Sequence, residues 1–369
     1  MKSHVKTAKQ TTAGHRAGSK KSKRRNMPLP LVILIDLLLT GAGLVIFALF
    51  HHVLPRDIKS SGIMLPRPSI TAVGASESGG TADSLISVSG DDISVSASAS
   101  SSVSASADET TGAPPAASGA WGAKFAGHFT GGDVITTDDS YQSAHISINL
   151  TRVQTGKVAY IVADIYLSDI DYFRTAFATG QYGRGLTGQV LDMAKENRAI
   201  LAISGDYYGI RDSGIVIRNG ELYRETTFQD VLIMNYDGTM ETVTADGFDL
   251  NKVMQNGAWQ AWSFGPMLLD NGQPMTRFNS SVTAANPRSA IGYYEPGHYC
   301  FVLVDGRQPG YSEGLNMTQL SQLFYDLGCK AAYNLDGGQS AVMTFMDRIA
   351  NQPYHNGRRI SDIVYIAER

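Results

Sequence analysis

The stretch HYCFVLVDGRQPGYSEGLNMTQLSQLFYDLGCKAAYNLDGG, residues 298–338, decides the fold because it places an amphipathic segment between two apolar runs. The runs 298–304 and 330–335 predict strands. Residues 316–328 repeat apolar side chains at i, i+3, i+4 and i+7 from Leu320, which is the spacing of a helix. A strand, helix, strand crossover makes the two strands parallel and brings their carboxyl ends to one edge of a sheet.

An acidic residue followed by glycine comes directly after both of these strands, at Asp305 and at Asp336. A third apolar run, 199–204, leads into GDYYG, so Asp206 also follows a predicted strand. Ligands of open α/β sheets bind beyond the carboxyl ends of the strands. The three turns together therefore predict a ligand site, although any one of them alone fits an ordinary Asp-Gly turn.

Charge is unevenly distributed along the 369 residues. Residues 1–26 carry nine Lys or Arg and no Asp or Glu, whereas the whole chain has a net charge of −3. The rest of the chain is therefore acidic, which argues against nucleic acid as a partner. Residues 1–28 are predicted to be a basic cytoplasmic tail.

The run LVILIDLLLTGAGLVIFALF, residues 31–50, contains one ionisable residue, Asp36. Twenty helical residues span the roughly 30 Å hydrocarbon core of a bilayer. A cleaved signal peptide has a shorter apolar region and a small-residue cleavage site, and neither is found here. We predict a transmembrane helix at 29–53 that contacts the lipid bilayer. The basic cluster before it predicts a single-pass protein of the cell membrane, with its N-terminus in the cytoplasm and its C-terminal domain extracellular.

Residues 54–120 are rich in Ser and Ala and poor in large apolar residues. Such a segment buries too little apolar surface to fold, so it is predicted to be a disordered stalk. The two cysteines, Cys300 and Cys329, lie beyond it. They could form a disulfide or remain as two buried free thiols.

Further apolar runs bounded by turn residues predict strands throughout the folded part, 121–369. They are AHISINL, KVAYIVADIYL, SGIVIRNGELY and DVLIMNY. The fold class is therefore α+β, with a mixed β-sheet and flanking helices in a single globular domain.

Several ordered segments resemble the phosphodiester glycosidase family. They are AISGDYYG, SGIVIRNGELY, WSFGPMLLDNGQP, NPRSAIG and the stretch quoted above. The resemblance covers about residues 140–368 and is greatest to membrane-anchored members from Gram-positive bacteria. It implies an extracytoplasmic hydrolase that cleaves a GlcNAc-like glycosyl phosphodiester in a cell-wall or exopolysaccharide glycan, releasing sugar and a phosphomonoester. The alternative is a non-catalytic glycan-binding or assembly module of the cell envelope.

Cleavage at an anomeric carbon usually enlists two carboxyl groups, and Asp336, Asp206 and Asp305 are the candidate catalytic residues. Arginine binds an anionic phosphate through two planar donors. The candidate substrate-binding residues are Arg288, Arg307, Asn286, Gly265, Gly306, Asn334, Gly337, Gly338, Ser340 and Glu313. No cofactor is expected, and a divalent cation held by the three aspartates stays open.

Overall fold

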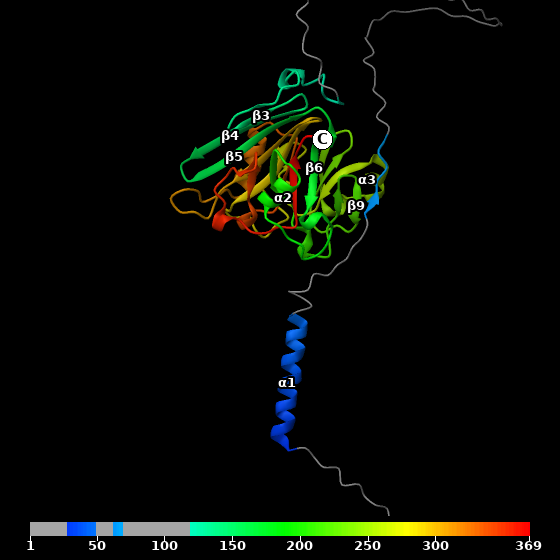
Figure 1. Ribbon diagram of the computed structural model, residues 1–369, viewed down its shortest axis with the longest axis vertical. Helices are drawn as coiled ribbons and strands as arrows, with labels where there is room; N and C mark the ends of the chain where they lie inside the picture. Colours follow the sequence, from blue (N-terminus) through cyan, green and yellow to red (C-terminus); the bar gives the residue numbers. More distant parts are fainter. Residues whose placement is uncertain (1–27, 49–61, 69–118) are drawn as a thin grey trace, which may run out of the picture. The chain divides into compact units, whose positions relative to one another are not determined.

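Residues 28–48, 62–68 and 119–369 are described by the computed structural model (Figure 1). They fall into two units, one with helix α1 (Leu29–Ala48) and the other with residues 62–68 and 119–369. Within these ranges no helix is both long and apolar enough to cross a membrane, so the predicted span at 29–53 is not shown. The predicted basic tail and most of the predicted stalk lie outside the described residues.

The largest sheet has seven strands and includes the stretch that decides the fold. In spatial order its strands are β17 (Ala331–Asn334), β15 (Arg288–Glu295), β16 (His298–Val304), β5 (Val158–Leu167), β4 (Ile146–Thr155), β3 (Ser140–Gln142) and β2 (Ile135–Thr136). Neighbouring strands pair antiparallel throughout this sheet. Figure 1 shows β4 and β5 as a long hairpin. Six of the seven residues of β16 are buried, which explains its continuous apolar sequence.

Strands β16 and β17 run parallel, as predicted, because both pair antiparallel with β15 between them. Helix α4 (Met317–Asp326) connects them and begins with a capping box, which satisfies backbone N–H groups at its start. Asn316 Oδ1 accepts from Gln319 N at 2.8 Å, and Gln319 Oε1 accepts from Asn316 N at 3.0 Å. The crossover prediction is confirmed, with one strand inserted that the sequence pattern does not predict.

Close packing explains why β15 carries a glycine at its centre. A Cβ atom at Gly292 would lie 2.6 Å from Cys300 Sγ and 2.8 Å from Cys329 Sγ. The two cysteines are buried free thiols whose sulfur atoms are 3.8 Å apart. Any larger side chain at this position would have to displace both sulfur atoms.

The second sheet has six strands and reaches back into the region predicted to be a stalk. Its order is β1 (Ile63–Met64), β9 (Glu221–Arg224), β8 (Val216–Arg218), β12 (Ala258–Trp262), β10 (Val231–Asn235) and β11 (Met240–Val243). Figure 1 shows β1, in blue, beside β9. Leu65 is buried in the apolar cluster under this sheet, and its N–H donates to Gly220 O at 2.8 Å. Residues 62–68 therefore belong to the folded domain rather than to the predicted disordered stalk.

The third sheet has five strands, and a small hairpin and several short helices complete the described elements. The strands are β19 (Arg348–Ile349), β18 (Met343–Phe345), β7 (Leu201–Ser204), β20 (Asp362–Ile366) and β6 (Phe173–Phe177), and the hairpin is β13 (Leu269–Asp270) with β14 (Gln273–Pro274). The remaining α-helices are α2 (Val190–Glu196) and α3 (Leu250–Asn256). The 3₁₀ helices are η2 (Ala126–His128), η3 (Ile170–Tyr172), η4 (Ala178–Gly180), η5 (Tyr208–Ile210), η6 (Ala245–Gly247), η7 (Gly338–Ser340) and η8 (Tyr354–Asn356).

One core joins the three sheets around Phe173. Its ring makes edge-to-face contacts with Trp262 of the six-stranded sheet and with Tyr299 and Phe301 of the seven-stranded sheet. Such aromatic pairs stabilise beyond the area they bury. The result is a single sheet-rich domain with few helices, in agreement with the predicted single domain.

Candidate active site

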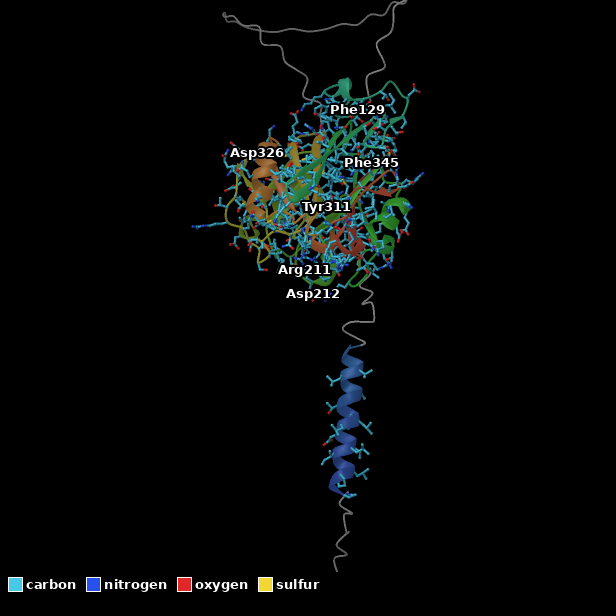
Figure 2. The ribbon with its side chains drawn as sticks, turned by 90° about the vertical axis from the view of Figure 1, so that its left-hand side faces the viewer. Phe129, Arg211, Asp212, Tyr311, Asp326 and Phe345 are labelled. Carbon is cyan, nitrogen blue, oxygen red and sulfur yellow. The ribbon has the colours of Figure 1, made fainter. Side chains whose placement is uncertain are left out.

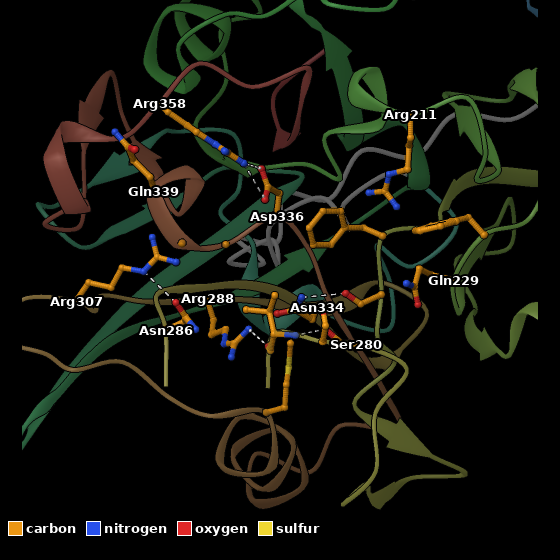
Figure 3. Close-up of a pocket in the computed structure, with 18 residues that line it drawn as sticks. Arg211, Gln229, Ser280, Asn286, Arg288, Arg307, Asn334, Asp336, Gln339 and Arg358 are labelled. Carbon is orange, nitrogen blue, oxygen red and sulfur yellow. Dashed lines mark hydrogen bonds and ion pairs between the residues drawn. The ribbon is translucent and has the colours of Figure 1, made fainter. Parts of the chain in front are cut away.

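A pocket of about 410 Å³ is lined by residues that directly follow β17 (Figure 3). The charged side chains that line it are Arg211, Arg288, Arg307, Arg358 and Asp336. Among the described residues lining this pocket, Asp336 is the only carboxylate. The excess of positive charge suits an anionic ligand.

Asp336 is nearly buried and is held by its backbone as well as by its side chain. Its N–H donates to Gly205 O at 3.0 Å, and Ser204 Oγ donates to its carbonyl oxygen at 2.9 Å. Arg358 Nη2 lies 3.3 Å from Oδ1 and 3.0 Å from Oδ2. Burial raises the pKa of Asp336, and the positive charge of Arg358 opposes that rise. Asp336 is thus a partly desolvated acid that is fixed by hydrogen bonds, and it differs in this from a solvated turn residue.

Other atoms of the protein approach the two glycines after Asp336 too closely to leave room for a side chain. A Cβ atom at Gly337 would lie 2.6 Å from Pro287 O. Gly338 has φ +61°, and a Cβ atom there would lie 3.2 Å from the guanidinium of Arg307. Glycine is the residue that fits both positions.

Arg288 supplies charge to the pocket while its donors bind backbone. Nε donates to Leu315 O at 3.1 Å, and the two Nη atoms donate to Val282 O at 3.1 Å and Ala284 O at 2.5 Å. Burial, followed by the nearby charge of Arg307, lowers the pKa of Arg288 to about 10. Arg288 therefore organises the wall formed by residues 282–286 and contributes positive potential.

Arg307 reaches the pocket from the loop after β16. It is exposed, and its Nε donates to Asn286 Oδ1 at 2.9 Å. Its guanidinium also lies 5.6 Å from the centre of the Tyr354 ring. These contacts orient the side chain without neutralising it.

The sequence does not predict Arg358 or Arg211 as site residues. Arg358 lies in the loop before β20, donates from Nε to Ser340 Oγ at 2.6 Å and lies 4.7 Å from the Tyr207 ring centre. Arg211 follows η5. Arg358 adjoins none of the three acidic turns, and Arg211 lies two residues after GDYYG, where no motif marks it as a ligand-binding residue.

Most of the predicted binding residues do meet in this pocket. Those that line it are Gly265, Asn286, Arg288, Arg307, Asn334, Gly337 and Gly338. Asn334 donates from Nδ2 to Gly265 O at 3.0 Å, and Ser340 touches the pocket through Arg358. Their roles stay predictions.

Asp206 lies behind the pocket wall in a buried ion cluster. Arg218 Nη2 lies 2.9 Å from Asp206 Oδ2 and 2.9 Å from Asp362 Oδ2. Asp206 also accepts from the N–H of Tyr208 at 3.0 Å. Burial raises the pKa of Asp362, and Arg218 opposes the rise. The cluster holds the loop after β7, whose Gly205 carbonyl binds Asp336.

Asp305 lies in a different cavity. It accepts from Asn351 Nδ2 at 2.7 Å, Gln352 N at 3.1 Å and Tyr311 Oη at 2.9 Å. These partners and Asp305 line a second cavity of about 310 Å³. The carboxylate therefore ties the loop after β16 to the loop after β19.

Glu313 and Gly306 also lie outside the pocket lining. Glu313 forms an exposed ion pair with Lys157 at 2.9 Å. A Cβ atom at Gly306 would lie 2.7 Å from Pro287 N, so this glycine allows the backbone to pack. No group of three His, Cys, Asp or Glu side chains suited to a metal ion is found in the described part of the chain.

Comparison with known proteins shows a similarity to one family. Residues 197–367 match the phosphodiester glycosidase family. This match spans less than half of the 369-residue chain. The SPbeta prophage-derived protein YomE of Bacillus subtilis (strain 168) is 31% identical over 164 residues, which cover 41% of this chain. The match spans only 25% of the length of YomE.

The chain is also similar to a solved structure. That structure is the catalytic domain of zebrafish N-acetylglucosamine-1-phosphodiester alpha-N-acetylglucosaminidase, auto-inhibited by its pro-peptide. The TM-score is 0.50 at 21% identity, and the alignment covers 61% of this chain and 83% of the zebrafish chain. This likeness supports the fold. The pocket residues Arg211, Asp336 and Arg358 all lie within the family match.

Proposed function

We propose that residues 121–369 form a phosphodiester glycosidase domain, and that it hydrolyses a glycosyl phosphodiester in which a GlcNAc-like sugar is joined through phosphate to a cell-wall or exopolysaccharide glycan. One observation carries the proposal: Asp336 is the single carboxylate among the described residues of a pocket lined by four arginines. The four arginines fit an anionic substrate, and the single carboxylate fits a group that accepts or donates one proton.

The arginines act on the phosphate. When the bond between C1 of the sugar and the phosphate oxygen breaks, its electron pair stays on that oxygen, and the leaving phosphomonoester gains a second negative charge. Arg307 and Arg358 flank the turn at Gly337 and Gly338 and are placed to stabilise that charge. Because the phosphate is neutralised in this way, its departure does not require a separate proton donor.

Asp336 acts on the sugar side. Its carboxylate accepts a proton from the water that adds to C1 and then returns this proton to solvent. Arg358 favours the ionised form that this step needs. Asp206 is buried against Arg218, so we assign it to holding the loop behind Asp336 and not to chemistry.

The sequence supports an extracytoplasmic location for this reaction. The apolar run at 31–50 follows a basic cluster, which favours a membrane anchor with residues 121–369 outside. Glycans that contain phosphodiesters would then be accessible to the domain.

The direct test is turnover of methyl N-acetyl-α-glucosaminyl phosphate by residues 56–369. The expected products are GlcNAc and methyl phosphate. Proton and phosphorus NMR measure their release. Binding of this compound and of wall glycans without any turnover would instead favour the non-catalytic module.

A further inference from the structure

Three of the four arginines of the pocket, Arg211, Arg288 and Arg307, have no carboxylate partner among the described residues. Arg358 is paired with Asp336, and Arg288 donates to backbone carbonyls. Arg307 and Arg211 form no ion pair with any described residue. Both therefore present an uncompensated positive charge.

Arg307 and Arg211 lie on opposite sides of the pocket. Figure 3 shows Arg307 beside Asn286 on one side and Arg211 on the other, with Asp336 between them. They come from separate loops, one after β16 and the other after η5. Figure 2 shows Arg211 and Asp212 at the end of the folded domain opposite Phe129. A single phosphate held beside Arg307 leaves the charge of Arg211 without a ligand.

Arg211 is held in place by aromatic rings. The carbon at the centre of its guanidinium lies 4.8 Å from the centre of the Phe228 ring and 5.1 Å from that of Phe264. Nη1 donates to Ser263 O at 3.5 Å. Stacking on aromatic faces fixes the plane of a guanidinium and leaves its edge donors available for a carboxylate or phosphate. Phe228 is 47% exposed and lines the pocket together with Phe264.

We propose that the sugar of the substrate carries a second anionic group, a phosphate or a carboxylate, on the side away from the scissile phosphate, and that Arg211 binds it. This inference rests on the proposed function, because it places the scissile phosphate beside Arg307 and Arg358. The pocket volume of about 410 Å³ lies within the range for small-ligand sites, roughly 300–1,000 Å³. The sugar of the substrate is then itself anionic and not an uncharged sugar.

Three probes test the second anion. They are methyl N-acetyl-α-glucosaminyl phosphate, its 6-phosphate and the analogue with a carboxylate at C6. A hydrogen-bonded charge contributes about 1.5–3 kcal/mol, so kcat/KM for the preferred charged probe should exceed that of the uncharged one by about 10- to 100-fold. Comparison of the two charged probes distinguishes a phosphate from a carboxylate.

Variants separate the two arginines. In Arg211→Gln the preference for the charged probe should fall to about one, whereas Arg307→Gln should lower kcat/KM for all three probes by a similar factor and keep the preference. Arg348→Gln is the matched control, because Arg348 is exposed and paired with Asp138 outside the pocket lining. Melting temperatures confirm that each variant folds.

The second anion subsite would be overturned if the parent enzyme did not prefer a charged probe over the uncharged one. It would also be overturned if this preference were unchanged in Arg211→Gln. If no probe is cleaved, the proposed hydrolysis fails. Kd values measured by calorimetry for the same probes then test the subsite. The subsite requires that a charged probe binds more tightly than the uncharged probe, and that this difference in Kd is lost in Arg211→Gln.

Discussion

The backbone N–H of Asp336 donates to the carbonyl oxygen of Gly205 at 3.0 Å. The acid at the end of β17 is thus fixed to the loop that follows β7, a strand of a different sheet. A Cβ atom at Gly205 would collide with the carboxylate of Asp362, which Arg218 holds in the buried cluster. A chain of contacts therefore runs from Arg218 to the catalytic candidate.

Replacement of the candidate base should abolish most turnover. Asp336→Asn keeps the size of the side chain but removes its charge, and loss of a positioned base commonly lowers the rate by about 10²–10⁴. Steady-state turnover of methyl N-acetyl-α-glucosaminyl phosphate measures the loss, and the melting temperature should stay near that of the parent. A folded variant that keeps more than about a tenth of parental turnover would rule out this role.

The pH profile should report the environment of Asp336. The active form is the carboxylate, so kcat/KM should rise with pH through the pKa of Asp336, which burial raises above its usual value of 3.8. Arg358 favours the charged form and lowers this pKa. In Arg358→Gln the acidic limb should move to higher pH, whatever the loss in maximal rate. An acidic limb that stays in place or moves to lower pH would contradict the assignment.

The buried cluster predicts a large effect on stability. Arg218→Met leaves Asp206 and Asp362 buried without their cation, and breaking a buried ion pair in this way costs about 3–5 kcal/mol. Urea denaturation measures the loss in the free energy of unfolding. The exposed pair of Arg348 with Asp138 is the control, and Arg348→Met should cost about 0–1 kcal/mol. Equal effects of the two changes would show that the cluster is not the support inferred here.

The segment at 62–68 predicts a contrast between neighbouring residues. Leu65 is 3% exposed and Met64 is 64% exposed. Burying a leucine stabilises by about 1.5–3 kcal/mol, so Leu65→Asp should lower the free energy of unfolding by at least that amount. Met64→Asp in the same segment should change it by less than about 0.5 kcal/mol, as exposed substitutions usually do. Thermal denaturation of residues 56–369 makes the comparison, and equal melting temperatures for the two variants would refute the docking of Leu65.

Elements with strong local signals could be predicted from the sequence. Helix α4 carries its apolar spacing and the capping pair Asn316 and Gln319, and these contacts lie within one turn. Strand β15 is buried over its first six residues and lacks alternation, so its pattern does not distinguish it from a loop rich in small residues. Residues 62–68 fold because β1 pairs with β9 at the edge of the sheet. The local sequence does not show that this edge is free for pairing.

Strand order predicts the site residues that follow strands of one sheet. Asp336 and Arg307 follow strands of one sheet and line the same pocket. Asp206 follows a strand of another sheet and meets Arg218, a partner that no spacing rule connects to it. Arg358 and Arg211 come from loops whose approach depends on how the sheets pack, which tertiary contacts alone determine.

Strand β1 changes what a proteolytic cut would do. Pro68 and Gly119 belong to the same folded unit, so the fifty residues from 69 to 118 begin and end on one body. A cut between them breaks the chain, but the fragment that contains Leu65 and Arg67 should stay bound through its contacts with β9, Gly220 and Asp171. A cut between residues 49 and 61 separates α1 from that body at once. We therefore expect a single cut to release the domain from α1 when it falls within the thirteen residues 49–61, and not when it falls within 69–118.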